Sequence, residues 1–420
     1  MISRLCNQDE LKNAIGNREL YFWGARHGYG MCRVFQRLGF SPGGFIDSSP
    51  AMTGQTILGF PIHRPEAIIN TTGKKPYIVI TSSFFADEIS EKCRGAGFID
   101  EVDFIPFTHI QRMDYQVDIS GMCNLRCISC PRGNMPGQPA AGFMSAENYR
   151  MVIDKILRED PFTGIVTLYN WGEPLLNPEL PEILRMTNER GLLAAISSNL
   201  NIKKDFSDVI KAKPMWFRIS VSGYGKSYEI THTGGDWKLL LKNMLLLKSF
   251  RERYHPDMIV EMFYHIYRHN NTDDFKNMKR LCEELGFTFR YRHAALAPLD
   301  NIDAVINGRP VSAEARRAME LQILPVNEAM AVARDQRERE CAYERCLWIT
   351  WDMTVSQCME WYAGGRKLTP GNFLETPLGD IIAARRNNSF CDHCKQQAIH
   401  RCYTVYGDEN LIRQRKSVEL

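Results

Sequence analysis

The segment Cys123-Asn-Leu-Arg-Cys127-Ile-Ser-Cys130-Pro131 places three cysteines on one short loop with the spacing C-x3-C-x2-C. It directly follows residues 116–120, whose sequence Gln-Val-Asp-Ile-Ser predicts a strand. Three thiolates on a compact loop can hold three corners of a [4Fe–4S] cluster and leave the fourth iron open to an outside ligand. A structural zinc site would need a fourth ligand, and no Cys or His follows within about forty residues. The loop therefore favours an iron–sulfur cluster over zinc.

Around this loop, strands and helices alternate from about residue 115 to residue 300. Ser145 is expected to cap a helix that ends near Arg158. Asn177, with Pro178 at the first helical position, is expected to begin a helix that Gly191 stops, and Thr272 to cap one that ends at Gly286. Strands are predicted at 116–120, 164–170, 193–197, 216–221, 258–264 and 287–291. Six β/α units predict a parallel sheet curled into a partial barrel, with ligands at the C-terminal ends of the strands.

The loop and the predicted barrel together resemble the radical S-adenosylmethionine (SAM) superfamily over about residues 115–300. The resemblance implies that the open iron of the cluster binds the amino and carboxylate groups of SAM. It also implies that an electron from the cluster cleaves SAM to methionine and a 5′-deoxyadenosyl radical, which removes a hydrogen atom from the substrate. In such enzymes the cofactor supplies the radical chemistry and the barrel supplies orientation and exclusion of water.

Further residues are similar to motifs of that family. Gly172-Glu173, in Trp-Gly-Glu-Pro after the second strand, resembles the Gly-Gly-Glu segment that holds the SAM amino group, with Trp171 in place of the first Gly. Arg268 is a candidate clamp for the SAM carboxylate. The family often has an aromatic residue at position 129, where this chain has Ser129. The remaining cofactor candidates at strand ends are Ser198, Asn199, Ser220 and Ser222, with residues 294–297 near the adenine.

The last eighty or so residues hold a second group of cysteines. Residues 346–358 read as a hairpin with a cysteine at each end, and Cys391-Asp-His-Cys394 follows. This resembles the SPASM or shorter twitch extension of radical SAM enzymes, although Met353 replaces the usual hairpin Gly. The resemblance implies one auxiliary [4Fe–4S] cluster on Cys346, Cys358, Cys391 and Cys394, with Cys341 and Cys402 in reserve. Taken alone, four cysteines in two pairs would fit a zinc ribbon equally well.

The N-terminal residues predict a separate nucleotide-binding type of domain. A buried strand at 20–23 runs into a loop with Gly24, Gly28 and Gly30, a helix follows, and Asp47 ends the next strand. The glycines would let the backbone approach a pyrophosphate, and Asp47 could bind a ribose hydroxyl. The spacing is similar to that of short-chain dehydrogenases or of small Rossmann domains on sugar-modifying enzymes. Binding of a nucleotide or nucleotide-sugar and a role only in packing or docking both stay open.

Composition limits the remaining possibilities. The chain has 420 residues, 44% hydrophobic and 24% charged, which is typical of a globular protein. Its formal net charge of +3 argues against a dedicated nucleic-acid binder. The first residues lack the apolar core of a signal peptide, and no apolar run would span a membrane, so we expect a cytoplasmic protein. The isolated Cys6, Cys32, Cys93 and Cys282 are expected to be core residues.

We therefore expect an α/β protein of three domains. These are a Rossmann-like domain (1–110), a partial (β/α)6 radical SAM barrel (111–335) and a small α+β iron–sulfur domain (336–420). The expected activity is oxidation or epimerisation of a sugar or nucleotide-sugar, with flavodoxin or ferredoxin as electron donor. Alternatives are a peptide-modifying maturase and a non-catalytic metal-binding nucleotide sensor. Candidate proton or hydrogen donors are Tyr224, His232, His265 and His293.

Overall fold

The computed structural model describes residues 8–25, 28–50, 52–71, 73–82, 85–137, 141–362, 368 and 371–408. They divide into two compact units. The first consists of Met1–Asp114, Ile153–Val166 and Thr187–Leu193, and the second of Tyr115–Val152, Thr167–Met186 and Ala194–Leu420. The first unit thus includes two segments of the predicted barrel, and the domain boundaries predicted at residues 110 and 335 stay predictions. Cys6 lies outside the described residues.

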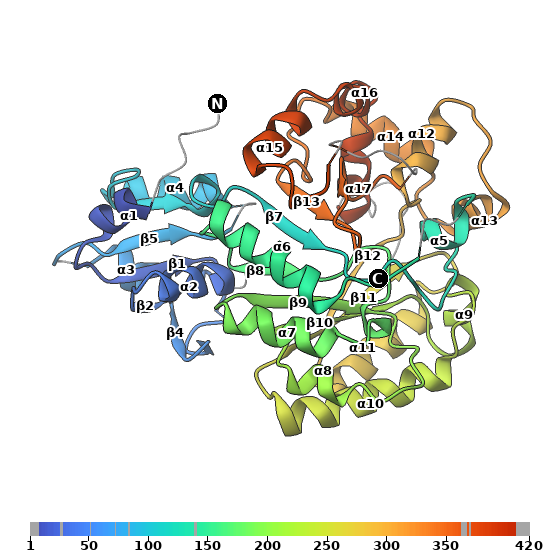
Figure 1. The fold of residues 1–420 in the computed structure, drawn as a ribbon, viewed down its shortest axis with the longest axis horizontal. Coiled ribbons are helices and arrows are strands. Elements are labelled where there is room, and N and C mark those ends of the chain that lie inside the picture. The colour runs from blue at the N-terminus through green and yellow to red at the C-terminus, as the bar shows by residue number, and fades with distance from the viewer. Residues whose placement is uncertain are drawn as a thin grey trace. The chain divides into compact units, whose positions relative to one another are not determined.

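The first unit is built on a six-stranded sheet of order β3-β4-β2-β1-β5-β6 (Figure 1). Its strands are β1 (Leu20–Trp23), β2 (Pro42–Ile46), β3 (Thr56–Ile57), β4 (Phe60–His63), β5 (Tyr77–Ile80) and β6 (Phe104–Pro106). All neighbours pair in parallel except β3 and β4, which are antiparallel. Its helices are α1 (Gln8–Ile15), α2 (Gly28–Arg37), α3 (Pro65–Ile69) and α4 (Ala86–Gly95).

Successive residues of β1 enter two different cores, because side chains alternate across a strand. Phe22 packs with residues of α1 and α2 in one cluster, and Trp23 packs with residues of α3 and α4 in the other. Both faces of the sheet are therefore covered, as the uninterrupted apolar strand Leu20–Trp23 predicts. Cys32 and Cys93 are fully buried in these two clusters, in agreement with their prediction as core residues.

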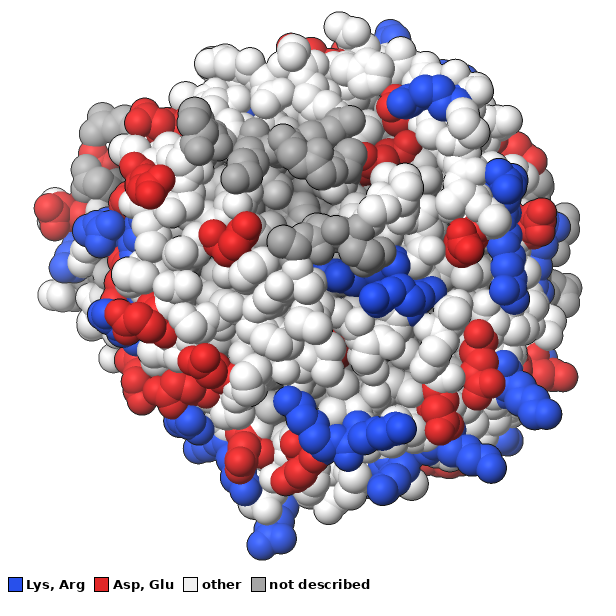
Figure 2. All heavy atoms as spheres, turned by 45° about the vertical axis from the view of Figure 1, so that its right-hand side comes forward, with Lys and Arg blue, Asp and Glu red and all other residues white. Residues whose placement is uncertain are grey.

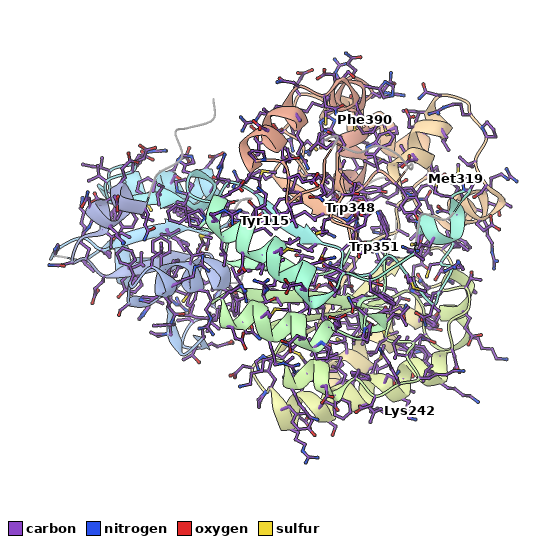
Figure 3. All side chains as sticks on the ribbon, in the orientation of Figure 1. Tyr115, Lys242, Met319, Trp348, Trp351 and Phe390 are labelled. Carbon is purple, nitrogen blue, oxygen red and sulfur yellow. The ribbon has the colours of Figure 1, made fainter. Side chains whose placement is uncertain are left out.

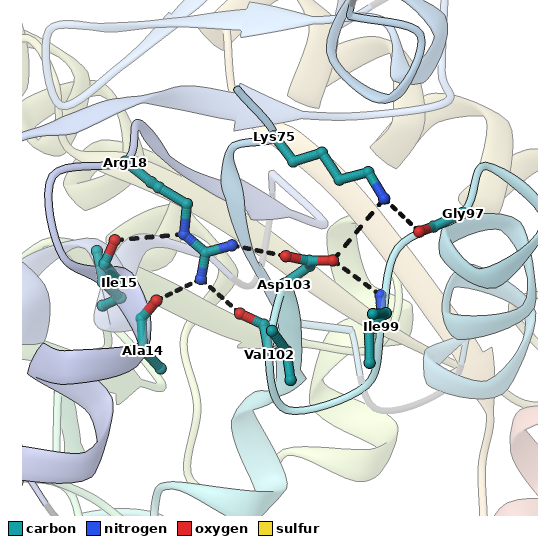
Figure 4. Close-up of polar contacts among 8 residues, drawn as sticks. All are labelled: Ala14, Ile15, Arg18, Lys75, Gly97, Ile99, Val102 and Asp103. Carbon is teal, nitrogen blue, oxygen red and sulfur yellow. Dashed lines mark hydrogen bonds and ion pairs between the residues drawn. The ribbon is translucent and has the colours of Figure 1, made fainter. Parts of the chain in front are cut away.

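A buried ion pair connects the end of α1 to the residue before β6 (Figure 4). Nη1 of Arg18 lies 2.7 Å from Oδ1 of Asp103, whose residue is 7% exposed. The other Arg18 nitrogens donate to the main-chain oxygens of Ala14, Ile15 and Val102. Oδ2 of Asp103 accepts the Ile99 N–H at 3.0 Å. Each charged group of this pair thus has hydrogen-bond partners, as burial of a charge requires.

The second unit contains an eight-stranded sheet of order β12-β11-β10-β9-β8-β7-β13-β14. Its strands are β7 (Asp114–Val117), β8 (Ile165–Thr167), β9 (Leu193–Ser198), β10 (Trp216–Val221), β11 (Ile259–Ile266), β12 (Thr288–His293), β13 (Cys346–Ile349) and β14 (Val355–Ser356). Strands β9 to β12 pair in parallel and in register, so that their carboxyl ends lie at one edge. The sheet is not closed, which agrees with the predicted partial barrel.

Helices follow most of these strands (Figure 1). They are α5 (Pro131–Asn134), α6 (Ala146–Glu159), α7 (Leu180–Glu189), α8 (Ser207–Lys211), α9 (Tyr228–Thr231), α10 (Trp237–Tyr254), α11 (Asp273–Leu285), α12 (Leu299–Ile306), α13 (Ala313–Leu321), α14 (Val326–Asp335), α15 (Leu378–Arg386), α16 (Ser389–Gln396) and α17 (Ile399–Gly407). Short 3-10 turns lie at Phe107–His109, Pro174–Leu176 and Gly225–Ser227.

The predicted helix ends are confirmed with two corrections. Ser145 accepts the Asn148 N–H at 3.1 Å, and Gly286 ends α11 with a φ of 67°. Helix α7 begins at Leu180 rather than at Pro178, because Asn177 instead accepts the N–H of Glu179 and donates to two main-chain oxygens. Thr272 precedes α11, but its side chain makes no capping hydrogen bond.

The C-terminal hairpin extends the barrel sheet, since β13 lies next to β7. The Asp118 N–H donates to the Ile349 oxygen at 2.8 Å. Trp351, labelled in Figure 3, belongs to the turn that connects the two strands of this hairpin. A Cβ added at Gly121 would lie 2.2 Å from its Nε1, and one added at Gly142 would lie 2.3 Å from its Cζ3. The hairpin therefore packs against residues on both sides of the cysteine loop, and those two positions need glycine.

Two further observations concern the length of the helices and the distribution of surface charge. None of the helices in the described residues is long and apolar enough to cross a membrane. On the face that Figure 2 shows, basic and acidic side chains are interspersed, in keeping with 52 basic and 49 acidic residues in the sequence.

Candidate functional site

The carboxyl ends of the barrel strands surround a cavity of about 280 Å³. Its lining comes from the cysteine loop, from the ends of β8 to β12 and from C-terminal residues. Of the predicted residues, the cavity brings together Cys123, Cys127, Cys130, Gly172, Glu173, Ser198, Asn199, Ser220, Ser222, His232 and His265. Parallel strands place residues that are distant in sequence at one edge, and the cavity is at that edge.

The cysteine loop is held by main-chain hydrogen bonds to the segment after β10. The N–H groups of Arg126 and Ile128 donate to the oxygens of Thr233 and Thr231, at 2.9 and 3.1 Å. The loop ends where Cys130 begins the short helix α5, with Pro131 at its first position. Asn199 contacts the first cysteine, because its Nδ2 lies 3.6 Å from the sulfur of Cys123. All three sulfur-bearing residues thus sit on a fixed backbone that faces one cavity.

The donor set fits an iron–sulfur cluster. Burial raises the pKa of the Cys130 thiol to about 12, and the pKa of Cys127 lies well above its ordinary value because of burial and of Cys130 and Cys123. Iron binds the thiolate form, so cluster assembly must release these protons. Among the described residues, no group of three or more His, Cys, Asp or Glu side chains is arranged to bind a single metal ion. The thiolates of a cluster bind different irons and need no such convergence.

Glu173 lies in the loop that follows β8 and is buried, with 2% of its surface exposed. Oε2 accepts the Asn199 N–H at 2.8 Å and Oε1 accepts the Leu175 N–H at 3.0 Å. Burial raises the pKa of this carboxyl group to about 7, while these hydrogen bonds and one from Ser198 act in the opposite direction. Both oxygens are therefore fixed in direction, which suits a group that positions a ligand.

Gly172 is required by the close approach of two chain segments. A Cβ at this position would lie 1.6 Å from the main-chain oxygen of Ser120. The next residue keeps this contact, because the Glu173 N–H donates to the Met122 oxygen at 2.7 Å. No side chain other than hydrogen fits there, and the Gly-Glu pair is consequently tied to the cysteine loop.

Three predicted residues do not line the cavity. Arg268 is exposed, and its Nε donates to the Gln322 oxygen at 2.6 Å. Tyr224 packs against Trp237, with ring centroids 4.9 Å apart. His293 is buried beside the end of β12. Their roles stay predictions, and the structure places them away from the cavity wall.

His232 and His265 both line the cavity, and both are neutral at pH 7. Burial lowers the pKa of His232 to about 4. The pKa of His265 is lowered to about 3. Burial is the largest cause, and the charges of Arg292, His232 and Arg218 contribute to the same value. The His232 ring stacks on Tyr228 at 4.4 Å, and its Nδ1 lies 3.1 Å from the Thr231 hydroxyl.

Other lining residues are absent from the sequence prediction. They are Tyr169, Tyr267, Arg292, Glu360 and Tyr403. Tyr267 is hydrogen-bonded to Ser129, the position where the family often has an aromatic residue. Burial raises the pKa of Glu360 to about 7, against the charge of Arg292 and a hydrogen bond from Tyr343. The signal that could have found Arg292 is the alternation Arg290-Tyr-Arg292, which puts two charges on one face, but the strand predicted at 287–291 ends one residue before Arg292.

The C-terminal cysteines form a second group of free thiols. Cys341 lies close enough to Cys358 and Cys394 for its charge to raise the pKa of both thiols. Burial is the largest cause that raises the pKa of Cys394 to about 12, and the charges of Cys341 and Cys391 contribute to that value. Cys346 begins β13, and its main-chain oxygen accepts from Arg385. The structure thus associates Cys341 with the predicted set, and the ligand role of Cys346 stays a prediction.

In the first unit, the predicted nucleotide-binding residues contact other residues of the unit, and nucleotide binding stays a prediction. The oxygens of Asp47 accept the N–H groups of Ala25 and Ser49, at 3.2 and 2.8 Å. A Cβ at Gly28 would lie 2.8 Å from the Phe45 ring, and one at Gly30 would lie 2.7 Å from Ile165. Gly24 has a φ of 112°. Residues 26 and 27 of this loop lie outside the described residues.

Residues 117–282 match the radical SAM superfamily. No curated protein matches the chain. Among solved structures, BtrN in complex with AdoMet and 2-DOIA is 15% identical, with a TM-score of 0.40 over 71% of this chain and 92% of BtrN. Streptococcus suis SuiB bound to S-adenosylmethionine is 15% identical (TM-score 0.46; 76% and 83% covered), and native anSMEcpe with bound AdoMet is 14% identical (0.45; 69% and 88%).

Proposed function

Residues 117–282 of this protein are a radical SAM domain, and from this premise we propose that it is an enzyme that oxidises or epimerises a sugar or nucleotide-sugar. A radical SAM enzyme binds SAM and a [4Fe–4S] cluster and needs a reductant. The observation that carries the proposal is the single cavity lined both by the three loop thiols and by a polar group of residues from other strands. A polar lining of hydroxyl, imidazole, guanidinium and carboxyl groups suits a substrate rich in hydroxyl groups.

The residues that would hold the cofactors lie on one side of this lining. Cys123, Cys127 and Cys130 would bind the cluster, and Gly172 with Glu173 would hold the amino group of SAM. The adenine would lie near Ala295 and Ala297, and Tyr267 supplies an aromatic ring that Ser129 does not. The chemistry supplied by the bound cluster and SAM is the removal of a hydrogen atom from the substrate.

The chain's own residues would orient the ligands and handle protons. The two main-chain N–H groups bound to Glu173 fix its carboxylate, so that the amino group meets a preset acceptor. His232 and His265, neutral because of burial, are able to accept a proton from the substrate. The buried Tyr228 ring stacks on His232, and the buried Tyr267 belongs to the cavity lining.

We further propose one auxiliary [4Fe–4S] cluster on the C-terminal thiols. Cys358, Cys391 and Cys394 supply three ligands, and Cys346 or Cys341 supplies the fourth. Electron uptake beside the cavity would serve an oxidation, since Glu360, only two residues after Cys358, lines the cavity. The iron content of the Cys341→Ala and Cys346→Ala variants decides between these two cysteines. In the variant that lacks the fourth ligand, the iron content should fall from about eight irons per chain towards about four.

The test of the proposed function is SAM cleavage by anaerobically reconstituted, chemically reduced protein. Wild type and a Cys282→Ala control, which changes a buried core cysteine, are expected to release 5′-deoxyadenosine, and Cys127→Ala is expected to release none. A reduced wild-type protein with about eight irons that releases no 5′-deoxyadenosine would refute the enzyme proposal and favour a metal-binding nucleotide sensor.

The substrate class needs a separate experiment. A panel of deuterium-labelled sugars, nucleotide-sugars and peptides is incubated with reduced enzyme, and transfer of deuterium into 5′-deoxyadenosine is measured. We expect transfer from a sugar or nucleotide-sugar, and transfer from a peptide alone would make the protein a peptide-modifying maturase. Calorimetric titration of the full chain with UDP- and GDP-sugars tests the nucleotide handle of the first unit, where a hollow of about 500 Å³ includes Arg64 and Lys92.

A further inference from the structure

The barrel interior carries an excess of arginine on its last strands. Glu261 of β11 is 1% exposed and lies 2.8 Å from the Nε atoms of both Arg218 and Arg290. One carboxylate therefore forms ion pairs with two guanidinium groups. Arg290 and Arg292 both belong to β12. Because they are two residues apart, their side chains lie on the same face of the strand, and Arg292 lines the cavity.

Arg292 has no carboxylate partner among the described residues within the 4.0 Å distance of an ion pair. Its Nη2 donates to the main-chain oxygen of Tyr403 at 2.8 Å, and its guanidinium carbon lies 5.8 Å from the centre of the Tyr403 ring. Glu360 faces the same cavity, but its hydrogen bond comes from Tyr343. The neighbouring His265, paired in register with Arg292, is kept neutral partly by the arginine charges. Among the described residues, Nη2 is thus the Arg292 nitrogen that makes a hydrogen bond, and the charge of Arg292 acts on Glu360 across the cavity lining without an ion pair.

We propose that Arg292 binds an oxyanion of the substrate, a carboxylate or a phosphate. A guanidinium group presents parallel donors that match both anions, and a partly buried arginine gains most from a charged partner. The inference rests on the proposed function, because it assigns this anion to the molecule that is modified. It narrows the substrate from polar molecules in general to acidic or phosphorylated ones.

The test measures anion binding to the reconstituted full chain with saturating SAM, using inorganic phosphate and acetate at constant ionic strength. We expect one of the two to bind saturably, and Arg292→Gln to weaken that binding about tenfold or more. Phosphate binding would identify a phosphorylated substrate and acetate binding a carboxylate. The control is Arg251→Gln, a half-buried arginine away from the cavity whose Nη1 donates to a main-chain oxygen at the same 2.8 Å; it should bind as wild type does. Arg292→Lys keeps the charge without the fork and should fall between.

Several results would overturn the inference. They are no saturable binding of either anion to wild type, equal affinity in the Arg292→Gln variant, or loss of SAM binding in that variant, which would assign Arg292 to the SAM carboxylate. Release of 5′-deoxyadenosine by wild type is measured separately. Anion binding without SAM cleavage refutes only the proposed function, and SAM cleavage without Arg292-dependent anion binding refutes only this inference.

Discussion

Both units of this protein are parallel-rich sheets, but the carboxyl ends of their strands differ. In the first unit, polar groups at these ends satisfy one another: the Thr81 hydroxyl donates to the oxygens of Trp23 and Gly24, and Asp47 accepts two main-chain N–H groups. In the second unit, the corresponding ends carry Ser197, Ser220 and His265 into a cavity. We therefore expect these strand ends of the first sheet to act as a scaffold, and those of the second, which leave polar side chains facing a cavity, to form the site of SAM cleavage.

Charge follows the same division. Arg18 of the first unit, with a side chain 12% exposed, has its carboxylate at 2.7 Å, whereas Arg292 of the second lines a cavity and donates to a main-chain oxygen. Burying a charge without a partner is costly, so the first arrangement stabilises a fold. The second arrangement has no such ion pair among the described residues, and it is the one that we propose for a ligand.

The largest expected effect comes from Gly172→Ala in the second unit. The added Cβ would meet main-chain atoms of Ser120 at 1.6 Å, so the Gly-Glu segment must move away from the cysteine loop. We expect SAM cleavage to fall at least about a hundredfold, since small displacements of positioning groups have effects of that size. Release of 5′-deoxyadenosine checks this prediction.

Gly43→Ala is the matched control in the first unit. Its Cβ would lie 2.9 Å from the far end of the Tyr21 side chain, which can move. We expect this variant to lose some stability and to keep the wild-type rate of SAM cleavage. Equal losses of activity in both variants would contradict the distinction between scaffold and site.

The next largest effect is on stability, from Asp103→Ala. The variant leaves the Arg18 guanidinium buried without its carboxylate, and removal of one partner of a buried pair costs about 3–5 kcal/mol. Urea unfolding of the full chain measures this. Glu88→Ala removes an exposed ion pair of the same 2.7 Å length, with side chains 46% and 57% exposed, and should cost less than about 1 kcal/mol. If the two variants unfold alike, the first unit does not depend on its buried charges.

The sequence predicts the parts of this molecule that are encoded locally. The cysteine loop is contiguous, and strands such as Trp216–Val221 and helix ends such as Gly286 carry short-range signals. Helix α10 carries a weaker one: its leucines at 239–241 and 245–247 run around the helix instead of marking one face. For that reason no periodic pattern predicts it.

The substrate side of the cavity is not encoded locally. Arg292, Glu360 and Tyr403 come from a strand, a post-hairpin segment and the last described helix, and they meet only because β13 joins the barrel sheet beside β7. No spacing rule connects residues brought together in this way. The glycines of the first unit show the converse, because Gly28 and Gly30 fit a nucleotide-binding spacing while the space beside them holds Phe45 and Ile165.

Acid sensitivity should come from the cavity side. His232 has a pKa of about 4 in the folded chain and an ordinary value of 6.5. The unfolded chain therefore binds the proton more readily, so the stability contributed by this histidine is complete above pH 6.5 and is lost as the pH falls towards 4. The difference of about 2.5 pH units corresponds to roughly 3 kcal/mol.

Unfolding free energies measured between pH 7 and pH 4 test this expectation. His232→Gln should flatten the pH dependence, whereas His63→Gln, in β4 of the first unit, controls for loss of an imidazole elsewhere. An unchanged slope in His232→Gln would show that the buried ring does not govern acid unfolding.

The smallest effect compares one hairpin from each unit. Met353 and Leu58 both have positive φ, at 64° and 51°, which disfavours a side chain by roughly 1–2 kcal/mol. Asn tolerates this conformation better, so Met353→Asn should stabilise the chain by about 1 kcal/mol. Leu58 also packs against the core cluster of the first unit, and Leu58→Asn should lose there what it gains in the turn. Thermal unfolding of the two variants checks this: a stabilised Leu58→Asn together with an unchanged Met353→Asn would mean that packing, and not backbone strain, governs the C-terminal hairpin.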